Sequence, residues 1–125
     1  MRFTAIALIG FLFGVVGMAI LNGSAQATAD QAARGKYLVM SAGKCSDCHG
    51  QHLQGSSLGF LRPGLPMLYY APKIAGLRQL SVADATTFLQ TGILPSGKHA
   101  LPPMPQFRFN HDDATAIVAY LRSLR

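Results

Sequence analysis

Cys45-Ser46-Asp47-Cys48-His49 is a C-x-x-C-H pentapeptide and the most informative stretch of this 125-residue chain. C-x-x-C-H is the pattern by which c-type haem is attached to a polypeptide. Two thiols at this spacing can each add to one vinyl group of the same porphyrin, and the adjacent histidine can then ligate the iron. The motif therefore predicts one covalent haem c, with Cys45 and Cys48 as attachment points and His49 as the proximal ligand.

Closely spaced cysteines also serve other chemistries. A thioredoxin-like C-x-x-C motif requires a strand–helix–strand setting, which the surrounding sequence does not indicate. A zinc site is another alternative, although four ligands within eight residues are more crowded than the separated pairs of most zinc sites. A disulfide between the two cysteines would close a very small, strained loop. Haem attachment is favoured because it alone also uses the adjacent histidine; the zinc alternative would use Cys45, Cys48, His49 and His52.

The N-terminal segment predicts export. Residues 3–21 are uncharged and almost wholly apolar, and they follow a single basic residue. Ala25-Gln26-Ala27 and Ala27-Thr28-Ala29 come next, and both are typical cleavage sites. We therefore expect residues 1–29 to be a signal peptide and the remaining domain to be a soluble periplasmic protein. Alternatively, the apolar run is just long enough to remain as an anchor in the inner membrane, facing the periplasm.

Composition allows one small domain, residues 30–125, and narrows its partners. Beyond Arg2, 10 Lys and Arg residues stand against 5 Asp residues, so the mature segment is basic. The basic residues are scattered rather than clustered, which argues against a nucleic-acid partner. A basic surface can instead steer a protein toward an acidic partner. Both cysteines belong to the motif, so no third thiol is left as an iron ligand.

Three segments carry helix signals. The first is expected over residues 31–42, with Asp30 as its cap and Gly43 at its end. The second begins at Ser81 and stops at Gly92, and an acidic residue follows its cap by three positions. The third begins at Asn110 with the same cap pattern, and its apolar residues recur at helical spacing. These are Ala114, Ile117, Val118, Leu121 and Leu124.

No segment predicts a convincing strand. Two long loops rich in Pro and Gly, residues 52–75 and 93–109, separate the helices. Such loops are unusual in a small domain, but they can wrap the two faces of a haem. The sequence therefore predicts an all-α domain with three main helices and long loops around one covalently attached haem.

A methionine is the usual sixth ligand when a His-ligated haem transfers electrons. Met104 lies in Leu101-Pro102-Pro103-Met104-Pro105, where the prolines stiffen the backbone that would present the thioether. We therefore predict His49 and Met104 as the two axial iron ligands. Met67 is a weaker candidate, and Met40, next to the motif, is expected in the core. Three further histidines are rivals, each expected to face solvent: His52, His99 and His111.

The chain resembles the class I monohaem cytochromes c over nearly all of residues 31–125. The resemblance is carried by Arg34-Gly35-Lys36-Tyr37-Leu38-Val39, by the haem motif, by Pro102-Pro103-Met104-Pro105 and by Ala119-Tyr120-Leu121-Arg122-Ser123-Leu124. It is most similar to the cytochrome c domains in haem subunits of bacterial periplasmic alcohol and sugar-acid dehydrogenases. Those subunits often carry several such domains, whereas this chain has one motif.

The resemblance implies further roles at matching positions. Gly35 would allow the first helix to cross the last one close to Tyr120. A proline carbonyl after the motif would accept a hydrogen bond from the ring N–H of His49 and fix its orientation. Pro63 and Pro66 both stand two residues before a leucine, as this role requires, and Pro66 is preferred.

The function implied is electron transfer between a periplasmic dehydrogenase-type donor and a respiratory oxidase or other acceptor, with no substrate of its own. The alternative is a gas-binding or catalytic small haem protein in which Met104 does not ligate iron. In the resembling family the exposed haem edge is framed by the loops before and after the methionine. Here those loops supply four candidate docking charges, namely Arg62, Lys73, Lys98 and Arg108.

Overall fold

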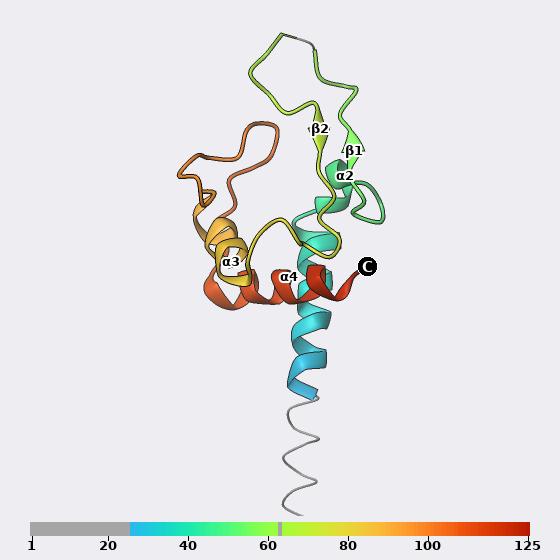
Figure 1. Cartoon of the computed structure of the whole chain (residues 1–125). Coiled ribbons are helices and arrows are strands. Elements are labelled where there is room, and N and C mark those ends of the chain that lie inside the picture. The colour runs from blue at the N-terminus through green and yellow to red at the C-terminus, as the bar shows by residue number, and fades with distance from the viewer. Residues whose placement is uncertain (1–25, 63) are drawn as a thin grey trace, which may run out of the picture. The chain divides into compact units, whose positions relative to one another are not determined.

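The computed structural model describes residues 26–62 and 64–125, which belong to two units (Figure 1). Of the first unit, Met1–Asp30, only residues 26–30 are described, and they are helical. The second unit is Gln31–Arg125. The predicted signal peptide or anchor, residues 1–29, lies outside the described residues except for its last four. Within the part of the chain that is described, no helix is long and apolar enough to cross a membrane.

The second unit is mainly helical, and all three predicted helices are present. Residues 31–37 are α-helical and continue into a π-helical stretch, η1 (Leu38–Ala42). The other two predicted helices are α3 (Val82–Thr91) and α4 (His111–Ser123). A short fourth helix, α2 (Cys45–His49), coincides with the haem motif. Lys44, which precedes α2, has a left-handed backbone with φ 46°, so the chain turns between η1 and the motif.

The predicted caps of α3 and α4 are present. The Ser81 hydroxyl accepts a 3.0 Å hydrogen bond from the Asp84 backbone N–H, and the Asn110 side chain accepts one of 2.8 Å from Asp113. Each bond satisfies an N–H group that the first turn leaves without a partner. Gly92 ends α3 in the left-handed conformation, with φ 71°.

The predicted cap at Asp30 is wrong, because Asp30 is itself helical. Alanine, the strongest helix former, occupies two of the preceding residues 26–29, so the helical conformation already exists before the aspartate. The Asp30 carboxylate instead accepts a 2.9 Å hydrogen bond from the side chain of Gln26, one turn earlier.

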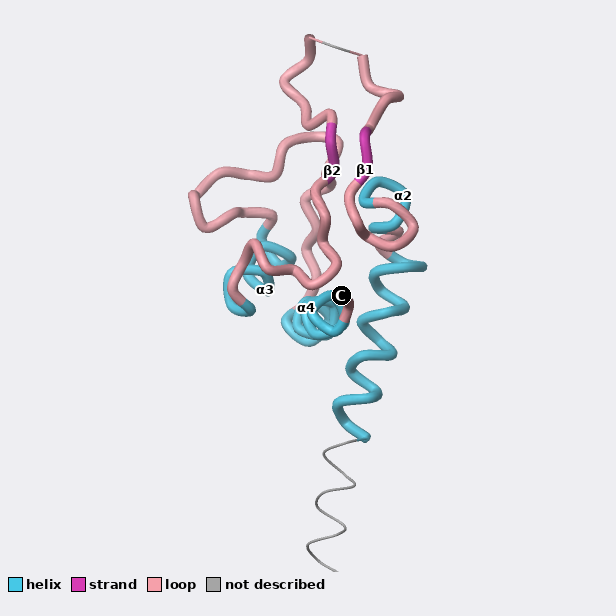
Figure 2. The backbone as a smooth tube through the Cα atoms, turned by 45° about the vertical axis from the view of Figure 1, so that its right-hand side comes forward, coloured by secondary structure: helices cyan, strands magenta, loops and turns pink. Residues whose placement is uncertain are grey.

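The structure adds one small sheet that the sequence does not predict. β1 (Ser56–Ser57) and β2 (Tyr70–Ala71) pair antiparallel, with Ser56 opposite Ala71 (Figure 2). Two-residue strands are too short to show an alternating pattern in the sequence. They can be recognised only in the folded structure, where the loop between them brings the two segments together. The second loop contains an isolated bridge between Ile93 and His99.

The core of this unit forms where the first helix, α3 and α4 meet. Val39, Leu53, Ile117 and Val118 are its largest fully buried side chains. The predicted apolar stripe of α4 supplies two of them, and α4 contacts both α3 and η1. Leu53 lies in a loop, yet it is buried, and its carbonyl accepts hydrogen bonds from the N–H groups of residues 74 and 75. This side of the core therefore fixes the segment that follows β2.

The first helix crosses α4 at Gly35. A Cβ built on Gly35 would lie 2.8 Å from the Cβ of Tyr120 and 2.7 Å from the backbone carbon of Ala116. Only glycine permits this separation without a shift of backbone. One turn away, Arg34 and Asp113 form a salt bridge at 2.5 Å between the same two helices.

Candidate haem-binding site

Helix α2 places both thiols and the histidine of the motif within about one and a half turns. Cys45 and Cys48 are half-buried free thiols. Burial raises the pKa of the Cys45 thiol above its ordinary value. Gly43 lies near both Cys45 and the ring of Phe109. A Cβ built on Gly43 would be 3.6 Å from the Cys45 sulfur and 3.9 Å from the Phe109 ring. The first thiol therefore sits in apolar surroundings that suit a porphyrin edge.

His49 is buried, with 6% of its surface exposed. Its ring nitrogen Nδ1 lies 2.7 Å from the carbonyl oxygen of Pro72. A carbonyl can only accept, so Nδ1 must carry the proton and donate. In the neutral imidazole the other ring nitrogen, Nε2, then presents its lone pair, which is the form that ligates a metal. The tautomer needed for axial coordination to iron is thus fixed by the fold.

The proline that accepts this hydrogen bond is Pro72, so the prediction of Pro66 is wrong. Pro66 is exposed and lies near the tip of the loop beyond the β1–β2 pair. There the Tyr69 hydroxyl accepts a 2.9 Å hydrogen bond from the Leu65 N–H and holds the tip together. The other candidate, Pro63, lies outside the described residues. Sequence spacing before a leucine could not locate the acceptor, because strand pairing decides which proline reaches His49.

Pro72 reaches His49 because it directly follows β2. Gly55, just before β1, donates its N–H to the His49 carbonyl at 2.8 Å. Gly55 has φ 91°, and a Cβ there would lie 2.9 Å from the carbonyl oxygen of Ala71. The sequence analysis did not single out Gly55, whose only signal is a glycine six residues after the histidine. It lets β2 and the Pro72 that follows it approach the motif.

Met104 is half-buried on the second loop, and its N–H donates to the Leu101 carbonyl at 3.2 Å. The preceding Pro102-Pro103 peptide is cis. The Pro102 carbonyl accepts a 2.8 Å hydrogen bond from the Leu68 N–H, which joins this loop to the one that contains Pro66. Met67, also half-buried, adjoins the same link. Met40 packs against the core, as expected from its position in the first helix.

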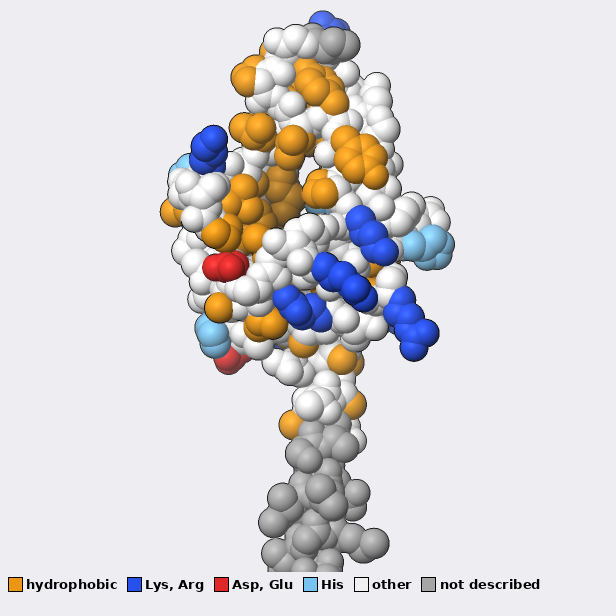
Figure 3. Space-filling view, viewed as in Figure 1, with side chains coloured by type: hydrophobic (Ala, Val, Ile, Leu, Met, Phe, Trp, Pro, Cys, Tyr) orange, Lys and Arg blue, Asp and Glu red, His pale blue; other side chains and the backbone are white. Residues whose placement is uncertain are grey.

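The two loops expose an unusual amount of apolar surface. Phe60 is 71% exposed and Leu101 49% exposed, and further large apolar side chains on these loops are also exposed. Figure 3 shows a hollow between β2 and the loop of residues 93–109, with hydrophobic side chains on its visible walls. Apolar surface of this extent marks a binding site more often than a free surface. The remaining exposed members are Leu65, Leu68, Tyr69, Tyr70 and Ile93.

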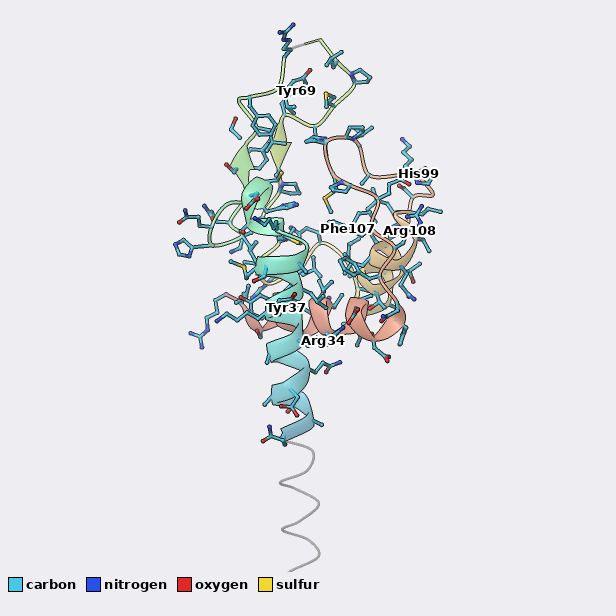
Figure 4. The ribbon with its side chains drawn as sticks, turned by 180° about the vertical axis from the view of Figure 1, so that it is seen from behind. Arg34, Tyr37, Tyr69, His99, Phe107 and Arg108 are labelled. Atoms are coloured by element: carbon cyan, nitrogen blue, oxygen red, sulfur yellow. The ribbon has the colours of Figure 1, made fainter. Side chains whose placement is uncertain are left out.

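These features fit a haem c. A porphyrin is a flat, largely apolar disc, and its contact with exposed apolar side chains would remove both from water. The motif supplies two thiols for attachment and one imidazole in the coordinating tautomer, and Met104 stands on the opposing loop. Phe107 and Phe109, whose ring centroids are 5.1 Å apart, add an aromatic wall on that loop (Figure 4).

The rival histidines and the zinc alternative receive no support from the geometry. His52, His99 and His111 are all exposed, as expected. Across residues 26–62 and 64–125, no group of three or more His, Cys, Asp or Glu side chains is placed to hold a metal ion.

The four predicted docking charges belong to separate segments; Lys98 lies in the second loop, where its carbonyl accepts a 2.8 Å hydrogen bond from the Leu94 N–H. Lys73 lines a surface pocket together with Arg78 and Arg125. Arg108 lies beside Gly92 at the end of α3, and Figure 4 shows it near His99, on the second loop. Arg62 belongs to the loop whose tip is held by Tyr69.

Fold and site define a small, mainly helical domain built to hold one covalently attached haem. The family model for cytochrome c matches residues 32–125, which is most of the chain. The chain therefore belongs to the cytochrome c family. Members of this family bind covalently attached haem c and are generally electron carriers rather than enzymes. Comparisons with curated proteins and with solved structures give no match.

Proposed function

We propose that this protein carries one electron at a time on a haem c held by Cys45 and Cys48, with His49 and Met104 as axial ligands. It has no substrate of its own. The donor is a periplasmic dehydrogenase of the alcohol or sugar-acid type, and the acceptor is a respiratory oxidase or another haem protein. The N-terminal sequence supports export to the periplasm, either as a soluble domain or on a membrane anchor.

The observation that carries this proposal is the orientation of the His49 ring by its hydrogen bond to Pro72. Its Nδ1 proton is committed to the Pro72 carbonyl at 2.7 Å, so Nε2 is the nitrogen left to coordinate iron. A histidine oriented in this way keeps its position in both oxidation states of the iron. Little reorganisation then accompanies each electron, and this suits a carrier.

The second loop supports a six-coordinate iron rather than an open one. Met104 is half-buried, and the Leu68–Pro102 hydrogen bond ties its loop to the opposing one. A thioether tethered in this way would hold the sixth position of the iron, which a gas or a peroxide would otherwise need. This favours a carrier over the alternative of a gas-binding or catalytic haem protein.

Carbon monoxide distinguishes the two functions. The holoprotein, purified from a host that attaches haem c, should show the spectrum of a low-spin haem when reduced. That spectrum should stay nearly unchanged under carbon monoxide, because methionine blocks the sixth position. A haem-binding globin treated in parallel provides the positive control. Rapid formation of a carbonmonoxy spectrum would reject the electron-carrier assignment in favour of the gas-binding one.

Co-purification from the native host identifies the partners. The carrier proposal expects a dehydrogenase to reduce the ferric protein directly and an oxidase to reoxidise it. Electron exchange should be measured by stopped-flow absorbance with each isolated partner. If neither a co-purified dehydrogenase nor any other periplasmic donor reduces the ferric protein, the proposed place in electron transfer is wrong.

A further inference from the structure

A basic pocket lies on the surface beside the segment that follows β2. Its walls include the side chains of Lys73, Arg78 and Arg125, and its volume is about 390 Å³. This volume lies within the range of small-ligand sites. Figure 3 shows Lys and Arg side chains gathered on this face of the unit, while the acidic side chains visible in the same view lie apart from them. The other residues that line it are Ala75, Gly76 and Gln79.

The floor of the pocket is fixed by the fold. Ala75 is buried, and its N–H donates to the Leu53 carbonyl at 3.0 Å. The Gly76 N–H donates to the Leu121 carbonyl of α4 at 2.8 Å. The Gln79 side chain donates to the Lys73 carbonyl and so closes the segment on itself. A rigid floor with long cationic side chains around it can receive a small ligand with little rearrangement.

Gly76 has no side chain to fill the bottom of the pocket. Its φ of 79° is a conformation that favours glycine, and a Cβ at this position would lie 3.8 Å from Nε of Arg78. Without that Cβ, a ligand can approach the backbone and the guanidinium together.

The charged side chains that line this pocket are all positive. No Asp or Glu lines it, and Lys73, Arg78 and Arg125 are all exposed. Among the described residues the one salt bridge joins Arg34 to Asp113, on the helix crossing. Like charges held around one small volume repel each other, and an anion bound among them removes that repulsion.

We propose that the pocket formed by Lys73, Arg78 and Arg125 is a binding site for a phosphate group. Guanidinium groups bind the oxygens of a phosphate in pairs, and an ammonium adds a point charge. Lys73, Arg78 and Arg125 all line the same pocket, so an anion bound there lies among three cationic side chains. The phosphate belongs either to a free anion or to a lipid headgroup, and both sources present the same chemistry.

The site is linked to the haem through one residue. Lys73 directly follows Pro72, whose carbonyl accepts the hydrogen bond from His49. This step rests on the proposed electron-carrier function. An anion bound here stabilises the extra positive charge of ferric iron. By reciprocity the ferric protein binds the anion more tightly than the ferrous protein does.

Calorimetric titration of sodium pyrophosphate into the ferric holoprotein, at low and constant ionic strength, tests the site. We expect saturable binding at one site per chain. The Lys73→Gln, Arg78→Gln double variant should weaken it by about tenfold or more, because two charge-assisted contacts are lost. The Lys36→Gln, Arg62→Gln double variant removes the same charge outside the pocket and should leave the affinity nearly unchanged. Absent saturation, or an equal loss in both variants, would overturn the proposal.

Two further arms define the source and the class of the ligand. Vesicles of phosphatidylglycerol, compared with phosphatidylcholine, test a lipid headgroup as the source of the phosphate. Variant-sensitive binding to the anionic vesicles would assign the phosphate to a lipid, and its absence would assign it to a free anion. A Glu-rich peptide of matched charge tests an acidic protein surface. Tighter, variant-sensitive binding of that peptide than of either phosphate probe would overturn the assignment to phosphate.

The redox link has its own readout. Pyrophosphate should bind the ferric protein about fivefold more tightly than the ferrous protein, and the midpoint potential should fall as pyrophosphate is added. Equal affinity in both oxidation states would reject the link and leave the binding site standing. Because the titration needs no redox partner, its outcome is separate from that of the electron-carrier proposal.

Discussion

The Nδ1 atom of His49 and the carbonyl oxygen of Pro72, 23 residues apart, are joined by a 2.7 Å hydrogen bond. This bond orients the imidazole, sets its tautomer and makes the ring a stronger electron donor to a metal. Backbone carbonyls cannot be removed by substitution, so the bond is best tested by displacing β2, which Pro72 directly follows.

Gly55→Ala should displace that strand. The added Cβ would lie 2.6 Å from the Tyr70 hydroxyl and 2.9 Å from the Ala71 carbonyl, and φ is 91° at this position. We expect a lower melting temperature and a higher midpoint potential, because a weaker bond to Pro72 makes the ligand less basic. Redox titration followed by absorbance measures the potential. In the control, Gly59→Ala, no heavy atom lies within 4 Å of the new Cβ, and equal effects in both variants would contradict the prediction.

Gly35→Ala should destabilise the helix crossing. The new Cβ would lie 2.7 Å from the carbonyl carbon of Ala116 and even closer to its oxygen, so one helix has to move. Overpacking of this kind costs about 1–3 kcal/mol, which outweighs the gain of roughly 1 kcal/mol in helix propensity. Urea unfolding of the holoprotein measures the free energy of unfolding. A variant as stable as Gly59→Ala would show that α4 adjusts freely at Tyr120.

Met104→Ala should remove the sixth iron ligand. We expect loss of the near-infrared sulfur-to-iron band of the ferric protein, a lower midpoint potential and new binding of carbon monoxide to the reduced protein. Met67→Ala is the matched control, because Met67 is also a half-buried loop methionine. The reverse pattern of results would assign the ligand to Met67 and make Met104 a packing residue.

Attachment of haem should depend on both thiols of α2. Cys45→Ala and Cys48→Ala should each reduce the yield of holoprotein, and the double variant should release its haem into acid-acetone. Intact mass measurement should show one haem on the unaltered polypeptide. Colour that extracts from the unaltered protein, or zinc found in its place, would refute covalent attachment.

Stability should fall in acid through the Arg34–Asp113 pair. The Arg34 guanidinium lowers the pKa of Asp113 below its ordinary value. A carboxyl with a depressed pKa in the folded state stabilises the fold above its unfolded pKa, and this contribution is lost as the pH falls through the folded value. Asp113→Asn should therefore lower the melting temperature at pH 7 and have less effect near pH 2. A difference independent of pH would contradict this electrostatic origin, because the Asn110 cap bonds the backbone N–H of residue 113 and is retained in the variant.

Much of the site follows from local sequence. The C-x-x-C-H motif itself specifies two thiols and one imidazole on consecutive turns, and those residues need no distant partner to be recognised. The caps at Ser81 and Asn110 are also local, because each side chain bonds an N–H three residues away. Interactions between residues three or four positions apart do not depend on the rest of the fold. The starts of the helices and the chemistry of the motif could therefore be predicted.

Other features depended on contacts between distant segments. Pro66 was preferred as the partner of His49 on spacing alone, and the pairing of β1 with β2 selects Pro72 instead. Asp30 carried a cap signal, but the residues before it are already helical. In the first case the fold uses a proline that the spacing pattern did not propose, and in the second the preceding helical residues leave the cap signal unused.

The sequence by itself determined that this chain attaches a haem and builds three helices, because thiol spacing, capping side chains and apolar periodicity act over a few residues. Only the tertiary structure decided which carbonyl holds His49 and which charges gather in one pocket. Lys73 and Arg125 are 52 positions apart in the sequence, and they share a pocket because the segment after β2 docks on Leu121 at the end of α4. The free energy of that docking comes from burial of the common core, a property of the whole unit and of no single stretch.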